Sequence, residues 1–274
     1  MNKNYLVSAV FGLTVAIATF NSVAVPNQKS STASDPCAIR NLTGNIPSSV
    51  HVVYQMHADT DTMRAREQAI FSGLQTYKIL RTLISQGVST ILLEGVEEKV
   101  NFADTYESSQ LKTLMDSYHH CVNQLSPSKS PLFAEEYCLA ASLYRSYPTP
   151  YILLEPVRLI GFENQAQYQR SLQLSQKYFT HENDAHAKHE FKEHVDRERS
   201  RIAVNAALNY AQHEKNVAVV IGEGHKISLE DYLQQIPSQR RPTFHFYDAV
   251  GCNSLVSIDR KSIQRLIGII SSLE

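Results

Sequence analysis

The sequence lacks a strong excess of charge of either sign. It carries 26 basic and 27 acidic residues over 274 positions. Proteins that bind nucleic acid or an anionic membrane surface usually concentrate positive charge. The composition therefore does not support either kind of partner.

The sequence also lacks a second long apolar run. A membrane-spanning helix needs about 20 apolar residues, and nothing beyond the first 25 positions has this character. Residues 1–24 have the order of a secretory signal peptide: Lys3, an uncharged apolar stretch, and small residues up to Ala24. An uncleaved anchor is the alternative, but the apolar stretch is short for it. We predict cleavage after Ala24, a periplasmic or secreted mature chain without a stable membrane span, and a flexible leader at 25–49.

Cysteine is scarce, and no Cys-x-x-Cys pair of the zinc or redox type is present. Because the four cysteines are an even number in a chain predicted to be exported, we expect disulfides. Of the three possible pairings, we favour Cys121 with Cys138, which are close in sequence, and Cys37 with Cys252, which would tie the two ends together.

Several standard catalytic motifs are missing. The sequence has no Gly-x-Ser-x-Gly, no P-loop, no Gly-x-Gly-x-x-Gly after the first predicted strand and no His-Glu-x-x-His. It therefore gives no support to the nucleophilic-serine, nucleotide-binding or zincin chemistries that these motifs carry.

What the sequence does contain is a series of short apolar runs separated by helical patterns. The runs that predict strands are 50–56, 89–93, 157–162, 217–221 and 242–248. Between the first two, apolar residues at helical spacing predict a helix that stops at Gly87. Strand, helix and strand in this order form a right-handed parallel crossover.

We therefore predict an α/β fold for residues 50–274, a single domain with a mostly parallel sheet and flanking helices. Helical pieces broken by Ser-Pro pairs at about 101–150 predict an inserted α-helical cap over the strand ends. A lid and a simple packing elaboration are both compatible with this segment.

Polar residues follow four of the predicted strands: His57, Glu94, Glu163 and His225. The carboxyl ends of parallel strands meet at one edge of a sheet, so these side chains are expected in one crevice. Two imidazoles with carboxylates and open positions for water suit a divalent metal ion used in hydrolysis. We predict His57, Glu94 and His225 as ligands of Mn, Co or Zn. Without a metal, a His and Glu pair can act as a general base on water.

Arg199 is predicted to belong to the same site. At 100° per residue it shares an apolar helical stripe with Phe191, Val195, Ile202, Ala206 and Tyr210. A guanidinium that faces inward is costly unless it pairs with a carboxylate or another anion; the alternative is a side chain that snorkels to the helix edge. The segment 181–194, rich in His and acidic residues, has no apolar face, and we interpret it as a solvated helix start.

The order of these residues resembles the superfamily that groups TraB/PrgY, GumN, Tiki, erythromycin esterase and ChaN proteins. That superfamily has two Gly-x-x-His motifs, a Glu after the second strand and an Arg on the helix before the last motif. Glu94, Arg199 and the sequence GEGH at 222–225 match it over about 50–235. The first motif departs from it, since Tyr54 stands at the Gly position before His57. Arg199 is followed by Ser, where many members have Asn or Asp.

Members of this superfamily differ in activity. Tiki proteins are metal-dependent proteases, erythromycin esterases open a macrolide ester, ChaN binds haem, and TraB/PrgY proteins act on peptide pheromone signalling. The resemblance implies a hydrolase-like α/β domain. Together with the signal-peptide pattern and the residues at the strand ends, it leads us to predict an exported, metal-dependent hydrolase of a peptide or ester bond with a peptide or small-molecule substrate. Glu94, Arg199 and Glu163 are the predicted catalytic groups, and Arg199 would orient the substrate. One alternative is haem or iron binding through Tyr54 or His57. Another is a non-catalytic periplasmic protein whose site has decayed.

Overall fold

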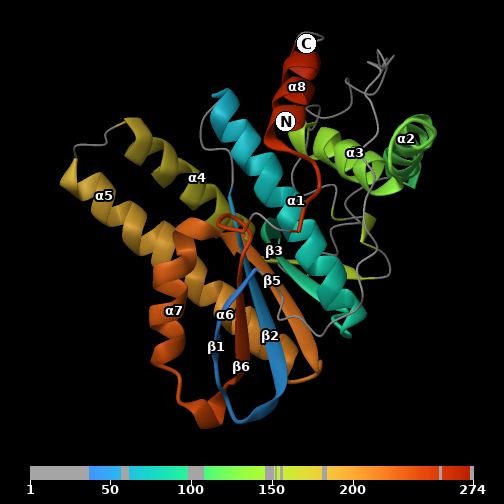
Figure 1. The fold of residues 1–274 in the computed structure, drawn as a ribbon. Coiled ribbons are helices and arrows are strands. Elements are labelled where there is room, and N and C mark those ends of the chain that lie inside the picture. The colour runs from blue at the N-terminus through green and yellow to red at the C-terminus, as the bar shows by residue number, and fades with distance from the viewer. Residues whose placement is uncertain are drawn as a thin grey trace.

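The computed structural model describes residues 37–56, 62–97, 108–145, 151, 153–154, 157–180, 184–252 and 255–271. Within them the chain forms a six-stranded sheet in the order β1-β6-β2-β5-β3-β4 (Figure 1). The strands are β1 (Ala38–Leu42), β2 (Ile46–Gln55), β3 (Thr90–Glu97), β4 (Arg158–Glu163), β5 (Asn216–Gly222) and β6 (Pro242–Asp248). All neighbouring strands run parallel except β1 and β6. The predicted α/β fold with a mostly parallel sheet is confirmed.

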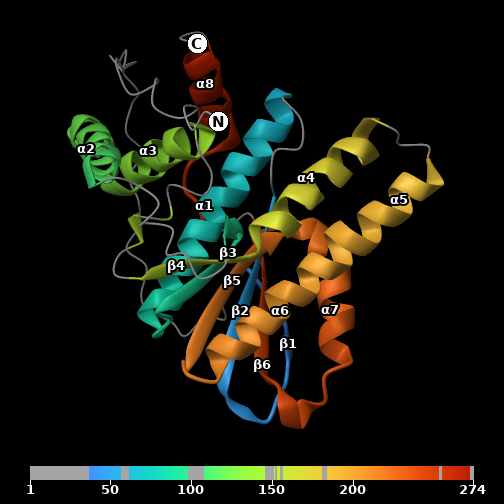
Figure 2. The same cartoon turned by 180° about the vertical axis from the view of Figure 1, so that it is seen from behind.

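Helices cover both faces of the sheet. They are α1 (Met63–Ser85), α2 (Ser108–Leu125), α3 (Pro131–Arg145), α4 (Gln165–Thr180), α5 (Ala185–Phe191), α6 (Glu198–Ala211), α7 (Lys226–Gln234) and α8 (Arg260–Ser271). Helices α1, α3 and α8 lie on one side, and α6 and α7 lie on the other, as Figures 1 and 2 show from opposite directions. None of the helices among the described residues combines the length and the apolar character that crossing a membrane would require.

The central strands carry apolar side chains to both helical layers. In β5, Ala218 and Val220 face the layer of α1, whereas Val219 and Ile221 face that of α6. All four are buried. This two-sided burial is the pattern expected of a central parallel strand, and it explains why the run 217–221 is apolar without interruption.

The ends of α1 follow from local sequence signals. Thr62 caps the first turn, where its side-chain oxygen accepts a hydrogen bond from the backbone N–H of Ala65 at 3.2 Å. After the last turn, Gly87 has a φ of 96°, a left-handed conformation that favours glycine. The predicted end of this helix at Gly87 is confirmed.

Residues 38–49 differ from the predicted flexible leader, because they belong to the sheet. β1 pairs with β6, and β2 already begins at Ile46. The side chains of β1 are mostly exposed, but its backbone is held in the sheet as an edge strand by pairing with β6. The rest of the predicted leader and the predicted signal peptide, residues 1–24, lie outside the described residues.

Both expected disulfides are present, Cys37–Cys252 and Cys121–Cys138. Such bonds persist in oxidising compartments, which fits an exported protein. Cys121–Cys138 joins α2 to α3 within the predicted helical insertion. α3 in turn packs against α1 and α8, so the described part of the insertion extends the helical layer on that side of the sheet (Figure 1).

Candidate functional site

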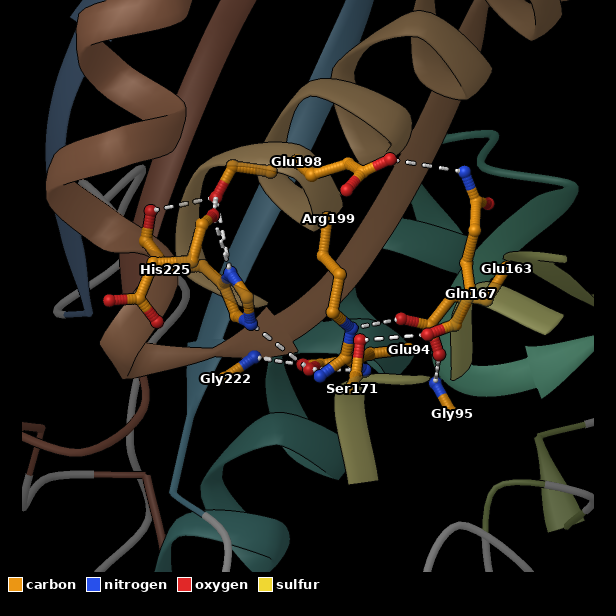
Figure 3. A network of polar contacts seen from close by, with 11 residues as sticks. Glu94, Gly95, Glu163, Gln167, Ser171, Glu198, Arg199, Gly222 and His225 are labelled. Carbon is orange, nitrogen blue, oxygen red and sulfur yellow. Dashed lines mark hydrogen bonds and ion pairs between the residues drawn. The ribbon is translucent and has the colours of Figure 1, made fainter. Parts of the chain in front are cut away.

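A cluster of charged side chains lies at the carboxyl ends of β3, β4 and β5 (Figure 3). Glu94 belongs to β3, Glu163 is the last residue of β4, and His225 ends a short 3-10 turn, Glu223–His225, that follows β5. Arg199 approaches from the first turn of α6. Glu94, Glu163 and His225 are buried, so their charges interact with little competition from water.

Arg199 lies between the two carboxylates. Its Nη2 is 2.9 Å from Glu94 Oε1, and its Nε donates a hydrogen bond to Glu163 Oε1. Only 12% of the Arg199 side chain is exposed. The guanidinium is inward-facing and paired with carboxylates, as predicted, and these two donor groups are directed at protein side chains. The predicted apolar stripe is wrong in its register, because Ile202, Ala206 and Tyr210 are only partly buried. The buried residues of α6 are Ser200, Ala203, Val204, Ala207 and Ala211.

Backbone amides hold the other oxygen of each carboxylate. The N–H of Gly222 donates to Glu94 Oε2 at 2.5 Å, and the N–H of Gly95 donates to Glu163 Oε2 at 2.8 Å. Gly95 has a φ of 77°, and the register of β3 with β4 shifts between Leu93 and Glu97. This bulge, which a glycine favours, turns the Gly95 amide toward the neighbouring strand.

His225 is held on both of its ring nitrogens. Its Nε2 lies 3.2 Å from Glu94 Oε1, and its Nδ1 lies 3.1 Å from Ser200 Oγ and 3.1 Å from the backbone oxygen of Asp196. Burial by itself would lower the pKa of His225, but the Glu94 carboxylate outweighs burial and raises this pKa above its ordinary value. The imidazole therefore tends to be protonated and paired with Glu94.

The charges of this cluster do not cancel when His225 is neutral. Glu94 and Glu163 contribute two negative charges, and Arg199 contributes one positive charge, which leaves one net negative charge. Because an uncompensated buried charge is unfavourable, the cluster favours one more positive charge beside Glu94. A proton on His225 supplies that charge, and a bound cation can supply it too.

Within the described part of the chain, no group of three or more His, Cys, Asp or Glu side chains is arranged to hold a metal ion. Glu94 and His225 provide two facing donors. The third predicted ligand, His57, lies outside the described residues.

The described part of the His-rich segment forms one-turn pairs on exposed and half-buried side chains. His186 Nδ1 is 4.0 Å from Glu190 Oε2, and His194 Nδ1 is 3.2 Å from Glu198 Oε2. Pairs of this kind are typical of a solvated helical surface. Residues 181–183 of the segment are not among the described residues.

Tyr54 does not join the cluster. It lies in the apolar core between β2 and α7, where its ring stacks on Phe246 and its hydroxyl donates a hydrogen bond to Glu230 Oε1 at 3.2 Å. Burial, and then the nearby Glu230 carboxylate, raise the pKa of Tyr54 far above its ordinary value. The hydroxyl is therefore committed to a protein carboxylate and is hard to ionise.

Two residues of the site were not predicted from the sequence. Asp196 and Ser200 both contact His225 Nδ1, and Asp196 belongs to a π-helical turn, Lys192–Arg197, between α5 and α6. Burial raises the pKa of the Asp196 carboxyl, although the neighbouring His225 opposes this shift. The sequence signal that could have indicated Ser200 was its position next to Arg199 on the same predicted helix. No sequence signal indicated the π-helical turn, because hydrophobic periodicity assumes a regular α-helix.

No protein-family model, curated protein or solved structure matches this chain. The likeness to the TraB/PrgY, GumN and Tiki superfamily therefore stays a prediction based on short motifs. The function has to be argued from the geometry and chemistry of the site itself.

Proposed function

We propose that the chain is an exported, metal-dependent hydrolase of peptide or ester bonds. The observation that carries this proposal is the 3.2 Å contact of His225 Nε2 with Glu94 Oε1, inside a buried cluster that needs one more positive charge. A neutral imidazole beside a carboxylate is a typical donor pair for a divalent metal ion. Mn, Co and Zn are the proposed metals.

The orientation of the two donors supports a metal at this position. His225 Nδ1 faces a backbone carbonyl, which is the outer partner that metal-bound histidines usually have. Glu94 Oε2 is held by the Gly222 amide, which directs Oε1 toward Nε2. His57 is the proposed third ligand. It follows Gln55 by two positions in the sequence, and Gln55 pairs with Gly222 in the sheet.

A divalent metal would supply Lewis acidity, which acidifies water and polarises a carbonyl group. Arg199 and Glu163 would keep Glu94 in place, and the charge of Arg199 would stabilise negative charge that develops on the substrate carbonyl. In metal-free protein at a pH where His225 is neutral, the pair of His225 and Glu94 could still accept a proton from water as a general base.

The predicted location agrees with this function. The two disulfides fit an oxidising compartment, and residues 1–24 have the pattern of a signal peptide. We propose the periplasm or the extracellular medium, where peptides and ester-containing small molecules are available as substrates.

The haem alternative gains no support from Tyr54. A tyrosine that ligates haem iron is ionised, whereas Tyr54 is buried, donates to Glu230 and has a raised pKa. Adding haemin to the purified protein separates the two functions, since a Soret band that is lost on His57→Ala would favour haem binding.

The test uses the purified mature chain, stripped of metal with a chelator and then reloaded with Mn, Co or Zn. We expect about one metal ion per chain and hydrolysis of a fluorogenic peptide library or of nitrophenyl esters. His225→Ala and Glu94→Gln should abolish both. His213→Ala is the matched control, because His213 is exposed beyond the carboxyl end of α6, and it should retain both. The proposal would be ruled out if the metal-free protein hydrolysed these substrates and its His225→Ala variant hydrolysed them equally well.

A further inference from the structure

The segment that leads into α6 contains a helical irregularity beside His225. In the turn Lys192–Arg197, the backbone N–H of Glu198 donates to the carbonyl of Glu193, five residues earlier instead of four. π-helical turns are rare and are frequent at functional sites. This one presents the Asp196 carbonyl oxygen to His225 Nδ1 at 3.1 Å.

Ser200 completes the surroundings of the same nitrogen. Its Oγ lies 3.1 Å from His225 Nδ1, and its hydroxyl donates a hydrogen bond to the Asp196 carbonyl. The Ser200 side chain is fully buried, and His225 is nearly so. Nδ1 therefore faces two oxygens that belong to the protein.

These contacts decide which ring nitrogen carries the single hydrogen when the imidazole of His225 is neutral. A carbonyl oxygen can only accept a hydrogen bond, and the hydroxyl hydrogen of Ser200 is directed at that carbonyl. Both oxygens near Nδ1 therefore act as acceptors, and Nδ1 must be the donor. The hydrogen bond on one ring nitrogen sets the state of the other.

We propose that Ser200 and the Asp196 carbonyl are positioning groups that keep a proton on His225 Nδ1. Nε2 is then the nitrogen that faces Glu94 and that exchanges a proton or binds the metal. Ser200 acts through His225 and does not touch the substrate. This inference rests on the proposed function only for its catalytic consequence. The protonation of Nδ1 itself can be measured without any substrate.

The first measurement is nuclear magnetic resonance of the full mature chain, labelled with 15N-histidine, metal-free and at a pH high enough for the imidazole of His225 to be neutral. We expect a hydrogen bound to His225 Nδ1 that exchanges slowly with water, assigned by its loss in His225→Gln. Ser200→Ala should speed its exchange, and Ser200→Thr, which keeps a hydroxyl, should preserve slow exchange. A wild-type His225 without a hydrogen on Nδ1 would overturn the proposal without the need for any Ser200 variant.

The second measurement is kinetic and uses the metal-loaded protein. Loss of an outer partner of a ligating histidine costs about 10- to 100-fold in activity or metal affinity. Ser200→Ala should therefore lower kcat by about 10-fold or more with KM nearly unchanged, and Ser200→Thr should restore it.

Ser171→Ala is the matched control for both measurements. Ser171 is also a buried helical serine that bonds the carbonyl four residues earlier, that of Gln167, at 2.9 Å. It does not share the Ser200 contact with His225 Nδ1 (Figure 3). If Ser200→Ala matches Ser171→Ala in exchange rate and in kcat, Ser200 has only a structural role and the proposal is wrong.

The two proposals fail in different ways. A slowly exchanging Nδ1 hydrogen in a protein without hydrolytic activity would remove the proposed function and leave the positioning of His225 intact. Hydrolysis by a protein whose His225 Nδ1 carries no hydrogen would overturn the positioning of His225 and leave the proposed function intact.

Discussion

His225 Nε2 lies 3.2 Å from Glu94 Oε1, although Glu94 belongs to β3 and His225 follows β5. β3 and β5 are parallel neighbours, so their carboxyl ends lie side by side. Arg199 then joins Glu94 to Glu163 on the next strand, β4. The predictions below concern this cluster and two other buried polar groups.

Removal of the guanidinium at position 199 should destabilise the fold strongly. Arg199→Met leaves Glu94 and Glu163 buried without their shared counter-ion, and breaking a buried pair on one side costs about 3–5 kcal/mol. Urea unfolding monitored by circular dichroism measures this loss.

The control for Arg199→Met is Arg201→Met on the same helix. Arg201 is exposed, so its loss should change the free energy of unfolding by no more than about 0.5 kcal/mol. Adding Glu163→Gln to Arg199→Met should recover part of the loss, because it removes one uncompensated charge. Equal effects of the two arginine variants would contradict the ion-pair network.

Metal-free protein should lose stability as the pH rises above neutrality. The pKa of His225 is raised above its ordinary value of 6.5, chiefly by Glu94 acting against burial. Folding therefore favours the protonated imidazole, and this contribution is complete below the unfolded pKa and disappears as the pH rises through the folded pKa. Urea titrations from pH 6 upward should show a decline that is flatter in His225→Gln. A decline that is identical in His225→Gln would assign it to other groups.

His51 should have the opposite pH dependence. Burial, and then the stacked His245, lower the pKa of His51 to about 4 from 6.5. The folded state resists protonation of this ring, so stability that is present above pH 6.5 is lost as the pH falls toward the folded pKa. The full loss is about 3 kcal/mol.

His51→Gln should remove most of this acid sensitivity between about pH 6.5 and 4, measured by urea unfolding at each pH. His213→Gln serves as the control, because His213 is exposed and its replacement should leave the acid limb as it is in the unmodified protein. If His51→Gln lost as much unfolding free energy on acidification as the unmodified protein does, the His51 ring would not titrate as its environment implies.

Glu136 should anchor the helical insertion to the C-terminal segment. Its Oε2 accepts hydrogen bonds from the backbone N–H groups of Ser257 and Ile258, both at 2.8 Å, and its Oε1 lies 3.1 Å from Lys78 Nζ. Glu136→Ala leaves these buried donors without an acceptor, and we expect a loss of about 3–5 kcal/mol. Hydrogen exchange of the Ser257 and Ile258 amides should accelerate in parallel.

Glu135→Ala is the matched control for Glu136. Glu135 is the adjacent residue, and it pairs with Arg81 on the surface, where ion pairs contribute about 1 kcal/mol or less. If both variants leave the two amides equally protected, Glu136 does not hold the insertion in place.

Much of the fold follows from short-range patterns in the sequence. The apolar run 217–221 forms the buried core of β5, and helical spacing followed by Gly87 predicts the end of α1. These features depend on neighbouring residues, because periodicity and a left-handed glycine act within a few positions of the chain. The disulfide pairing could also be predicted from the sequence. Sequence proximity favoured the pair Cys121 and Cys138, and the two remaining cysteines lie near the ends of the chain.

Other features depend on partners that are distant in the sequence. Residues 38–42 have no periodic pattern that predicts a strand, and only pairing with β6 makes them one. The π-helical turn at 192–197 adds one residue to the helical repeat. The buried face of α6 therefore lies one position beyond the predicted stripe, at Ser200, Ala203, Ala207 and Ala211. This shift, and the role of the turn beside His225, are visible only in three dimensions.

The sequence by itself determined the apolar cores of the strands, because strand preferences are local, and it marked Arg199 as an inward-facing charge. It placed the end of one strand before Glu94, whereas β3 continues to Glu97. Only the tertiary structure decided how these groups meet. The parallel register of β3 with its neighbours brings Glu94 to His225, the bulge at Gly95 turns an amide toward Glu163, and α6 delivers both Arg199 and Ser200. Hydrogen bonds and ion pairs act over a few ångströms, so they exist only after the sheet and its helices have packed.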